Sequence, residues 1–393
     1  MVTLQGTKGK PARAPRRNGT ATVFGAGIAG ASTALALQER GVETTLVDPW
    51  DPGHLRAASS GDHRILRTSH GSDELYTAWA KESRLRWLEF QERRGTQLFV
   101  QSGAVMLAHE RDSSWEEASA ATLGRLGIPS FRVSAEELRV RLPVLDTAGI
   151  AFGLWEPESG FVFARRALLA IVEEFEDRGG SCRKGSLSAG PDEVPLLDGA
   201  PVGSDLVICA CGAWMRDIFR RTLAPLLEIA RQDVILVAPP AGSRAFDADN
   251  FPAWIDHTYP AYGIPAVGGH GFKAVINWRG LSIDVDRDDR LVSQPAIARS
   301  RRYLATRFPT LLEQPIVGQE VGQIANTPDT QFLIDAHPDH PNVTIVAGDS
   351  GHMFKHGLVL GEYAARFALG EIEGEPRFAL RRRTRVAHND RPQ

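Results

Sequence analysis

Apolar residues recur at both ends of the chain in the order strand, helix, strand. An apolar segment over 21–24 ends at glycine, helical periodicity covers 28–38 up to a stop at Gly41, and a second strand covers 44–48. The runs at 205–211 and 342–347 are continuously apolar, which is typical of strands buried on both faces of a parallel sheet. Periodicity with start and stop signals predicts further helices over 73–94, 134–142, 164–178, 295–307 and 357–369.

The segments between these ends show a different pattern. Strands are predicted over 97–108 and 129–133, and alternation over 234–237, 254–256 and 273–278 predicts a largely antiparallel second sheet. Residues 49–71 are irregular and polar, and residues 156–160 form a turn. Because the chain leaves the parallel sheet and returns to it near its end, we expect an α/β fold with two interleaved domains.

The first strand, turn and helix carry a dinucleotide-binding motif. Gly25, Gly27 and Gly30 match G-x-G-x-x-G between an apolar strand and a helix. The first glycine permits a tight turn, the second lets the backbone approach a pyrophosphate, and the third lets the helix lie against the strand. Asp48 ends the next strand, where a carboxylate can bind both ribose hydroxyls. The motif does not distinguish NAD from FAD. Because the sequence holds one such motif, we expect the reducing equivalents to come from the substrate.

Composition and charge indicate a globular protein without a nucleic-acid partner. Of 393 residues, 42% are hydrophobic and 24% charged, and the net charge is −3. No run approaches the ~18 apolar residues of a membrane span. Cys182, Cys209 and Cys211 show no metal-ligand spacing, so we predict no metal site and a reducing, cytoplasmic environment. Residues 1–20 are a basic tail that we expect to be disordered.

Five segments in a common order resemble the glycine oxidase and D-amino-acid oxidase superfamily of FAD-dependent amine oxidoreductases. They are 25–30 with Asp48, 60–67, 156–160, 262–273 and 326–355. The resemblance is strongest to the group of monomeric sarcosine oxidase, N-methyltryptophan oxidase and L-pipecolate oxidase. It implies a Rossmann-type FAD-binding domain (21–95, 145–219 and 322–380) interleaved with a mainly antiparallel substrate domain (96–144 and 220–321).

The resemblance also implies roles for individual side chains. Arg67 and Lys355 match the pair that binds the substrate carboxylate, and Arg64 matches an arginine near the flavin ring. Lys273 matches the lysine that promotes reaction with O2, and Tyr262 matches a tyrosine that lines the substrate cavity. The residues expected to bind FAD are Gly25, Gly27, Ile28, Ala29, Gly30, Asp48, Ser60, Arg64, Gly212, Trp214, Gly351, His352, Phe354 and Lys355, with a structural role for His352.

Four positions depart from the group's pattern. The cysteine that anchors the flavin covalently is replaced by Gly322, so FAD is expected to be bound non-covalently and to have a lower potential. The active-site histidine after the lysine is Asn277, an aromatic position is Ile324, and the residue before Arg64 is His63. The pocket is therefore altered where it meets the substrate, and a bulkier or cyclic amino acid is expected in place of sarcosine.

The implied reaction is oxidation of the C–N bond of an amino acid or carboxylate-bearing secondary amine. Hydride passes to flavin N5, and reoxidation by O2 gives H2O2 beside an imine. Two alternatives stay open, a dehydrogenase that passes electrons to a non-oxygen acceptor and a non-catalytic flavin-binding subunit. The expected partners are a small amine and O2, with no nucleic acid or membrane, and the chain is expected to be a monomer or weak oligomer.

Overall fold

A six-stranded sheet forms the layer that carries the glycine motif. The computed structural model describes residues 19–276 and 282–381. In this sheet β19 alone is antiparallel to its neighbour, and the other five strands are parallel. The strands, in spatial order, are β19 (Leu333–Ala336), β20 (Val343–Ala347), β13 (Leu206–Cys209), β1 (Thr20–Phe24), β2 (Glu43–Asp48) and β9 (Ser181–Lys184).

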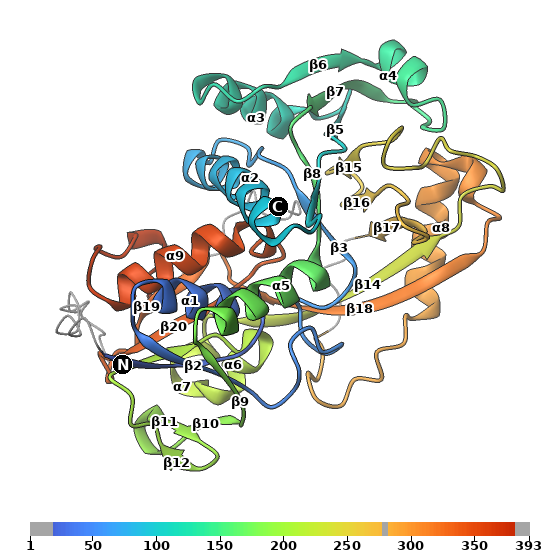
Figure 1. The fold of residues 1–393 in the computed structure, drawn as a ribbon. Coiled ribbons are helices and arrows are strands. Elements are labelled where there is room, and N and C mark those ends of the chain that lie inside the picture. Colours follow the sequence, from blue (N-terminus) through green and yellow to red (C-terminus); the bar gives the residue numbers. More distant parts are fainter. Residues whose placement is uncertain (1–18, 277–281, 382–393) are drawn as a thin grey trace, which may run out of the picture.

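Helices α1 (Ile28–Glu39), α5 (Ala164–Asp177) and α9 (Gly357–Ala368) cover one face of this sheet, and α2 (Glu74–Arg94) lies beyond them (Figure 1). Helices α1 and α9 approach closely because α9 has glycine where it meets α1. A Cβ on Gly357, for example, would lie 2.4 Å from Ile28 Cγ1. The start of α9 is thereby held beside the glycine loop. The other face is covered by a small sheet and two short helices, namely β10 (Leu187–Ala189), β11 (Pro195–Leu197), β12 (Ala200–Pro201), α6 (Met215–Ile218) and α7 (Arg220–Leu223).

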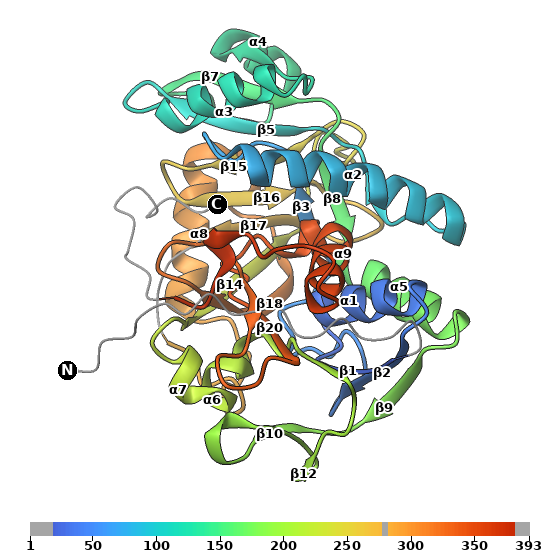
Figure 2. The same ribbon diagram turned by 90° about the vertical axis from the view of Figure 1, so that its left-hand side faces the viewer.

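An eight-stranded sheet forms the second layer. All its neighbouring strands are antiparallel except β15 and β5. Its strands, in spatial order, are β18 (Ile316–Asn326), β14 (Glu228–Val237), β17 (Phe272–Ile276), β16 (Ala261–Ile264), β15 (Ala253–Asp256), β5 (Ala104–His109), β7 (Ile150–Glu156) and β6 (Phe131–Ser134). The long pair β14 and β18 runs from this sheet toward the first one (Figures 1 and 2).

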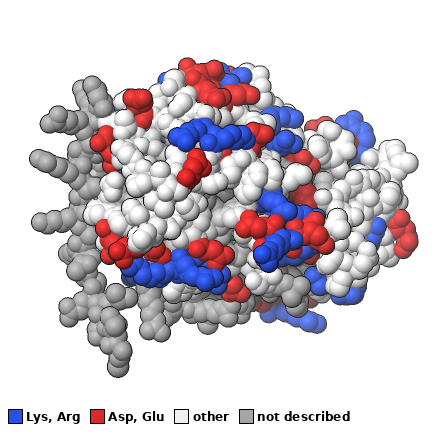
Figure 3. All heavy atoms as spheres, turned by 90° about the horizontal axis from the view of Figure 1, so that it is seen from below, with Lys and Arg blue, Asp and Glu red and all other residues white. Residues whose placement is uncertain are grey.

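The remaining elements connect or cover these layers. Three short strands form a third sheet that joins the two layers, and α8 and α3 pack on the eight-stranded sheet. They are β3 (His63–Leu66), β8 (Gly160–Phe163), β4 (Phe99–Val100), α3 (Ser114–Arg125), α4 (Ala135–Arg141) and α8 (Gln294–Arg307). Seen from below, acidic and basic side chains are interspersed on the surface (Figure 3).

The predicted helix over 73–94 is confirmed together with its ends. The Asp73 side chain accepts the Tyr76 N–H at 3.1 Å, which caps α2, and Gly95 ends it in the left-handed conformation at φ 61°. The predicted helices over 134–142, 164–178, 295–307 and 357–369 are confirmed to within two residues.

Three expectations need correction. Residues 49–71 contain a strand, β3, although they were expected to be irregular. The sequence pattern also missed α3, because its buried positions include the polar residues Glu116, Ser119 and Thr122. Strand β7, expected in the FAD-binding domain from residue 145 onward, pairs with β5 and β6 in the eight-stranded sheet. Some expectations fall outside the described residues. These are the tail over 1–18, Asn277, and the end of the strand expected over 273–278.

Candidate functional site

One cavity runs from the glycine loop to the edge of the eight-stranded sheet. All but one of the site residues expected from the sequence line it. The exception is Gly30, which lies behind the loop: a Cβ there would be 1.9 Å from Gly25 O. The lining residues that were expected are Gly25, Gly27, Ile28, Ala29, Asp48, Ser60, Arg64, Arg67, Gly212, Trp214, Tyr262, Lys273, Gly351, His352, Phe354 and Lys355.

The nucleotide end of the cavity is built by backbone and one carboxylate. Gly25 has φ +98°, and a Cβ there would lie 2.5 Å from Ala210 O, so the turn requires glycine. The Asp48 carboxylate accepts the Ala26 N–H at 2.7 Å and the Trp50 N–H at 2.9 Å, which fixes it at the end of β2. The Ile28 N–H, at the start of α1, donates to Ser59 Oγ at 2.9 Å. Ser59 therefore caps the helix start at that group.

The cavity fits a flavin dinucleotide by the polar atoms that it leaves without partners. Besides the glycine loop and Asp48, its wall holds two buried amide side chains from the paired strands β14 and β18. The amide oxygen of Gln232 and the amide nitrogen of Gln323 have no hydrogen-bond partner. Buried groups of this kind are normally paired, so they indicate a ligand with both donors and acceptors.

Two cations lie at the far end of the cavity with donors unused. Arg67 is 4% exposed, its guanidinium carbon lies 5.1 Å from the Trp115 ring centroid, and its Nη1 has no partner. Burial lowers the pKa of Arg67 to about 10. Burial, together with the charge of Arg67, lowers the pKa of Lys355 well below its usual range. In the described part of the chain Glu156 is the carboxylate whose charge favours both cations.

The Glu156 carboxylate makes no hydrogen bond to the Arg67 guanidinium. Its carboxylate accepts the Thr68 and Ser69 N–H groups at 2.7 and 3.0 Å, and the hydroxyls of Thr68 and Ser159 as well. Four donors thus satisfy the carboxylate without the arginine. The unused donors of Arg67 are available to a ligand that carries an anionic group.

Arg64 is held by the backbone. Its guanidinium donates to the carbonyl oxygens of His63 and Ala58 at 2.8 Å and of Ser60 at 2.6 Å, and it lies 5.9 Å from the Phe354 ring centroid. These contacts fix a positive charge in the middle of the cavity wall.

Lys273 has a charged partner that the sequence reasoning missed. Lys273 is 3% exposed, and its Nζ donates to the His63 carbonyl at 3.3 Å and to Glu320 Oε2 at 3.4 Å. Burial lowers the pKa of Lys273, although the Glu320 carboxylate opposes this. The pKa of Glu320 is lowered: burial raises it, but the charges of Lys273 and Arg64 outweigh burial. Burial also lowers the pKa of the neighbouring His63 imidazole to about 3, which keeps that ring neutral.

Strand register explains why these residues share one face. Lys273 lies opposite Leu236 of β14, two residues beyond Val234, which pairs with Glu320. Residues two apart on a strand point to the same side, so Glu320 shares the face of β18 that carries Gly322 and Ile324, and all three line the cavity. The period of two, counted back from Gly322, was the sequence signal that could have identified Glu320.

The cysteines do not lie at the position of the missing flavin anchor. Cys182 is exposed on β9, Cys209 is buried in β13, and Cys211 lines the cavity. Burial, with the nearby charge of Asp48, raises the pKa of Cys211, so it stays a thiol at the nucleotide end. Gly322, by contrast, lines the cavity with Gln232 as its nearest neighbour, 3.8 Å from where a Cβ would stand.

The chain belongs to the DAO family of FAD dependent oxidoreductases, whose model matches residues 20–367. The fold and the cavity define the same class, an FAD-dependent oxidoreductase with a Rossmann-type domain and a mainly antiparallel partner domain. The expectation of FAD as cofactor is thereby confirmed.

Relatives of known name cover nearly the whole chain. Monomeric sarcosine oxidase from Bacillus sp. (strain B-0618) is 27% identical over 356 residues, which are 88% of this chain and 91% of that protein. N-methyl-L-tryptophan oxidase from Citrobacter koseri is 27% identical over 367 residues, 89% and 94% of the two chains. A thermally stable mutant of fructosyl peptide oxidase has the same fold, with a TM-score of 0.83, 20% identity and coverage of 96% and 97%.

Proposed function

We propose that this protein oxidises the C–N bond of an amino acid or of a secondary amine that carries a carboxylate. The observation that carries this proposal is the pair Arg67 and Lys355 at the end of the FAD cavity. Arg67 has an unused buried donor, and Lys355 Nζ has no hydrogen bond or ion pair within residues 19–276 and 282–381. Buried cations are costly unless paired, so a bound carboxylate would complete the site.

The protein's own residues would bind and orient the substrate. Arg67 offers a planar, bidentate donor pair to a carboxylate, and Lys355 adds a point charge. Tyr262 lines the same cavity on β16, and burial raises its pKa, so its phenol stays protonated. FAD, when bound, would accept the hydride that leaves the carbon beside nitrogen, which turns the amine into an imine, and O2 would then take the electron pair and two protons to give H2O2. The sarcosine and N-methyltryptophan oxidases among the relatives support this class of substrate.

Lys273 supports the oxidase reaction, and Glu320 favours the alternative. A localised cation in the cavity would stabilise negative charge that develops on O2. The Glu320 carboxylate 3.4 Å from Lys273 Nζ compensates part of that charge. We therefore keep a dehydrogenase with a non-oxygen acceptor as the second candidate.

Three further features belong to the proposal, namely non-covalent FAD, a monomeric chain and a cytoplasmic location. Non-covalent FAD is supported by Gly322 and by the distance in sequence of all three cysteines from that strand. No helix of the described residues is long and apolar enough to cross a membrane. A monomer is supported by the name of the Bacillus relative, and a cytoplasmic location by three cysteines outside any disulfide.

Anaerobic mixing tests the proposal. N-methyl and cyclic amino acids should bleach the flavin absorption, whereas their decarboxylated amines should bleach it at least tenfold more slowly. Readmitted air should restore the colour with formation of H2O2. No bleaching by any amino acid would refute the proposal and favour a non-catalytic flavin-binding subunit.

Lys273→Met separates the two candidate functions. For an oxidase it should slow reoxidation by O2 strongly and leave anaerobic reduction nearly unchanged. Loss of both rates to the same extent would remove the argument for oxygen as the acceptor, and rapid reduction with slow reoxidation in the wild type would favour a dehydrogenase.

A further inference from the structure

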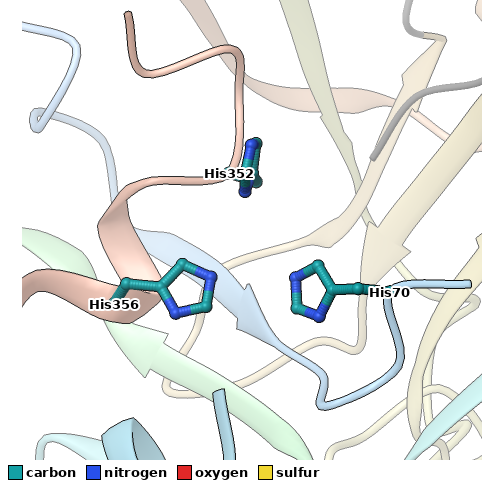
Figure 4. Close-up of side chains that lie close together, drawn as sticks. All are labelled: His70, His352 and His356. Atoms are coloured by element: carbon teal, nitrogen blue, oxygen red, sulfur yellow. The ribbon is translucent and has the colours of Figure 1, made fainter. Parts of the chain in front are cut away.

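Three histidines meet behind the carboxylate end of the cavity. His70 follows β3, whereas His352 and His356 lie in the segment that leads into α9. They are 6%, 4% and 0% exposed. One ring nitrogen of each lies within 4.8 Å of one from each of the others. The rings of His70 and His356 face each other, with His352 beside them (Figure 4).

Hydrogen bonds fix which nitrogen carries the proton in two of the three rings. His70 Nδ1 lies 2.9 Å from the Thr68 carbonyl, and His352 Nε2 lies 3.0 Å from the Thr330 carbonyl. A carbonyl oxygen can only accept, so these two nitrogens carry the protons. The other nitrogens, His70 Nε2 and His352 Nδ1, have no partner. The ring of His356 has the Trp79 backbone as a polar neighbour outside the cluster, at a geometry too poor for a regular hydrogen bond, so at least one of its nitrogens is also unpaired within the described residues.

This is the arrangement by which proteins prepare imidazoles for metal ions. A ligating histidine usually donates its second ring N–H to a backbone carbonyl or carboxylate, which fixes the tautomer. Three neutral imidazoles suit zinc and related ions, and they leave a fourth position for water. A purely structural role would leave three buried nitrogen acceptors unpaired, which is uncommon.

We propose that His70, His352 and His356 form a binding site for a divalent first-row transition metal, of which Zn²⁺ fits the ligand set best. The charges of Arg67 and Lys355 oppose a dication there. An ion that binds there must therefore gain enough from the imidazole ligands to outweigh that repulsion, which favours Zn²⁺ over hard cations such as Mg²⁺ and Ca²⁺ that need oxygen ligands. This proposal departs from the expectation of no metal site, which could not foresee the cluster because more than 280 residues separate His70 from His352.

A bound metal would join the two segments that carry the substrate-binding cations. Arg67 precedes His70 by three residues, and Lys355 is adjacent to His356. The metal would thus hold both segments without contacting the substrate carboxylate. This role goes beyond the proposed oxidation and does not depend on it.

The test uses the full-length, FAD-loaded protein without a polyhistidine tag, treated with chelator and then titrated with Zn²⁺ or Co²⁺. We expect one ion per chain by elemental analysis, a rise in melting temperature with Zn²⁺, and visible Co²⁺ absorption at wavelengths beyond the flavin bands. His356→Leu removes a ring that makes no regular hydrogen bond and should weaken binding at least tenfold.

Two further variants keep the result interpretable. His70→Phe should weaken binding in the same way if His356→Leu does not fold. His340→Ala is the control, since its ring bonds the Asp192 carbonyl elsewhere, and it should bind metal as the wild type does. Absence of stoichiometric metal in the wild type, or wild-type affinity in either cluster variant, would overturn the proposal.

Discussion

Replacement of Arg67 by methionine should stabilise the substrate-free protein and weaken carboxylate binding. Burial lowers the pKa of Arg67 from 12.5 to about 10. A lowered pKa means that the fold disfavours the charged form at every pH below about 10. At about 1.4 kcal/mol per pH unit, the charge costs about 3 kcal/mol of folding free energy at neutral pH. The cation–π contact with Trp115 returns about 1 kcal/mol, so Arg67→Met should gain about 1 to 2 kcal/mol.

The same substitution removes the bidentate donor for the substrate. Truncation of one partner of a buried, hydrogen-bonded charge pair costs about 2 to 5 kcal/mol, and 1.4 kcal/mol corresponds to tenfold in affinity. Binding of a simple carboxylate such as acetate or benzoate, followed through the flavin spectrum, should weaken about 100-fold. Glu156 keeps its four donors, so the variant should fold.

Thermal denaturation and titration of the FAD-loaded protein measure the two effects separately. We expect the melting temperature to rise by about 2 to 4 °C while carboxylate affinity falls. Arg132→Met is the matched control, because Arg132 lies 3.7 Å from the Phe152 ring centroid outside the cavity and should leave the affinity unchanged. A structural arginine would give the reverse pattern, a lower melting temperature with unaltered binding, and that result would refute the reasoning.

Three further substitutions test other parts of the cavity. Glu320→Gln leaves Lys273 without its carboxylate partner and should lower the free energy of unfolding by about 1 to 3 kcal/mol. In a double-mutant cycle with Lys273→Met we expect a coupling energy of at least about 1 kcal/mol, and additive effects would contradict the pairing. Gly322→Cys fits without a clash, because the added Cβ would lie 3.8 Å from Gln232, and it places a thiol on the cavity wall. Its acid-precipitated pellet should retain the yellow flavin, unlike wild type and Gly322→Ser; a colourless pellet would show that this strand does not present the thiol to the flavin. Burial raises the pKa of Asp349 to about 6, so the free energy of unfolding should fall by up to about 1.4 kcal/mol per pH unit as pH rises from about 4 to 6. Asp349→Asn should flatten this slope, and an equal slope in both proteins would exclude Asp349 as its source.

Local patterns in the sequence predicted the cofactor-binding half well. The glycine motif, Asp48 and the capped helix α2 depend on turn chemistry and periodicity, which are local properties. Strand β3 was missed because its charged residue Arg64 faces a cavity instead of solvent. A charge inside a short strand breaks the apolar pattern that identifies strands.

Contacts between distant segments could not be predicted in the same way. Glu320 meets Lys273 only because β14 lies between their strands and sets both registers. The cluster of His70, His352 and His356 depends on the packing of the α9 segment against the loop after β3. Neither arrangement has a sequence motif, since each partner stands alone in its own segment.

The four cations around the cavity differ in whether the protein itself supplies their hydrogen-bond partners. Arg64 donates to three carbonyls, and Lys273 has a carbonyl and a carboxylate, so the protein itself satisfies both. Arg67 has an unused donor, and the Nζ of Lys355 makes no hydrogen bond or ion pair in the described residues. A satisfied cation gains little from a further anion, whereas an unsatisfied one regains the cost of its burial. Selection for a carboxylate should therefore reside in Arg67 and Lys355, and an amine without that group should bind weakly even where its apolar part fits.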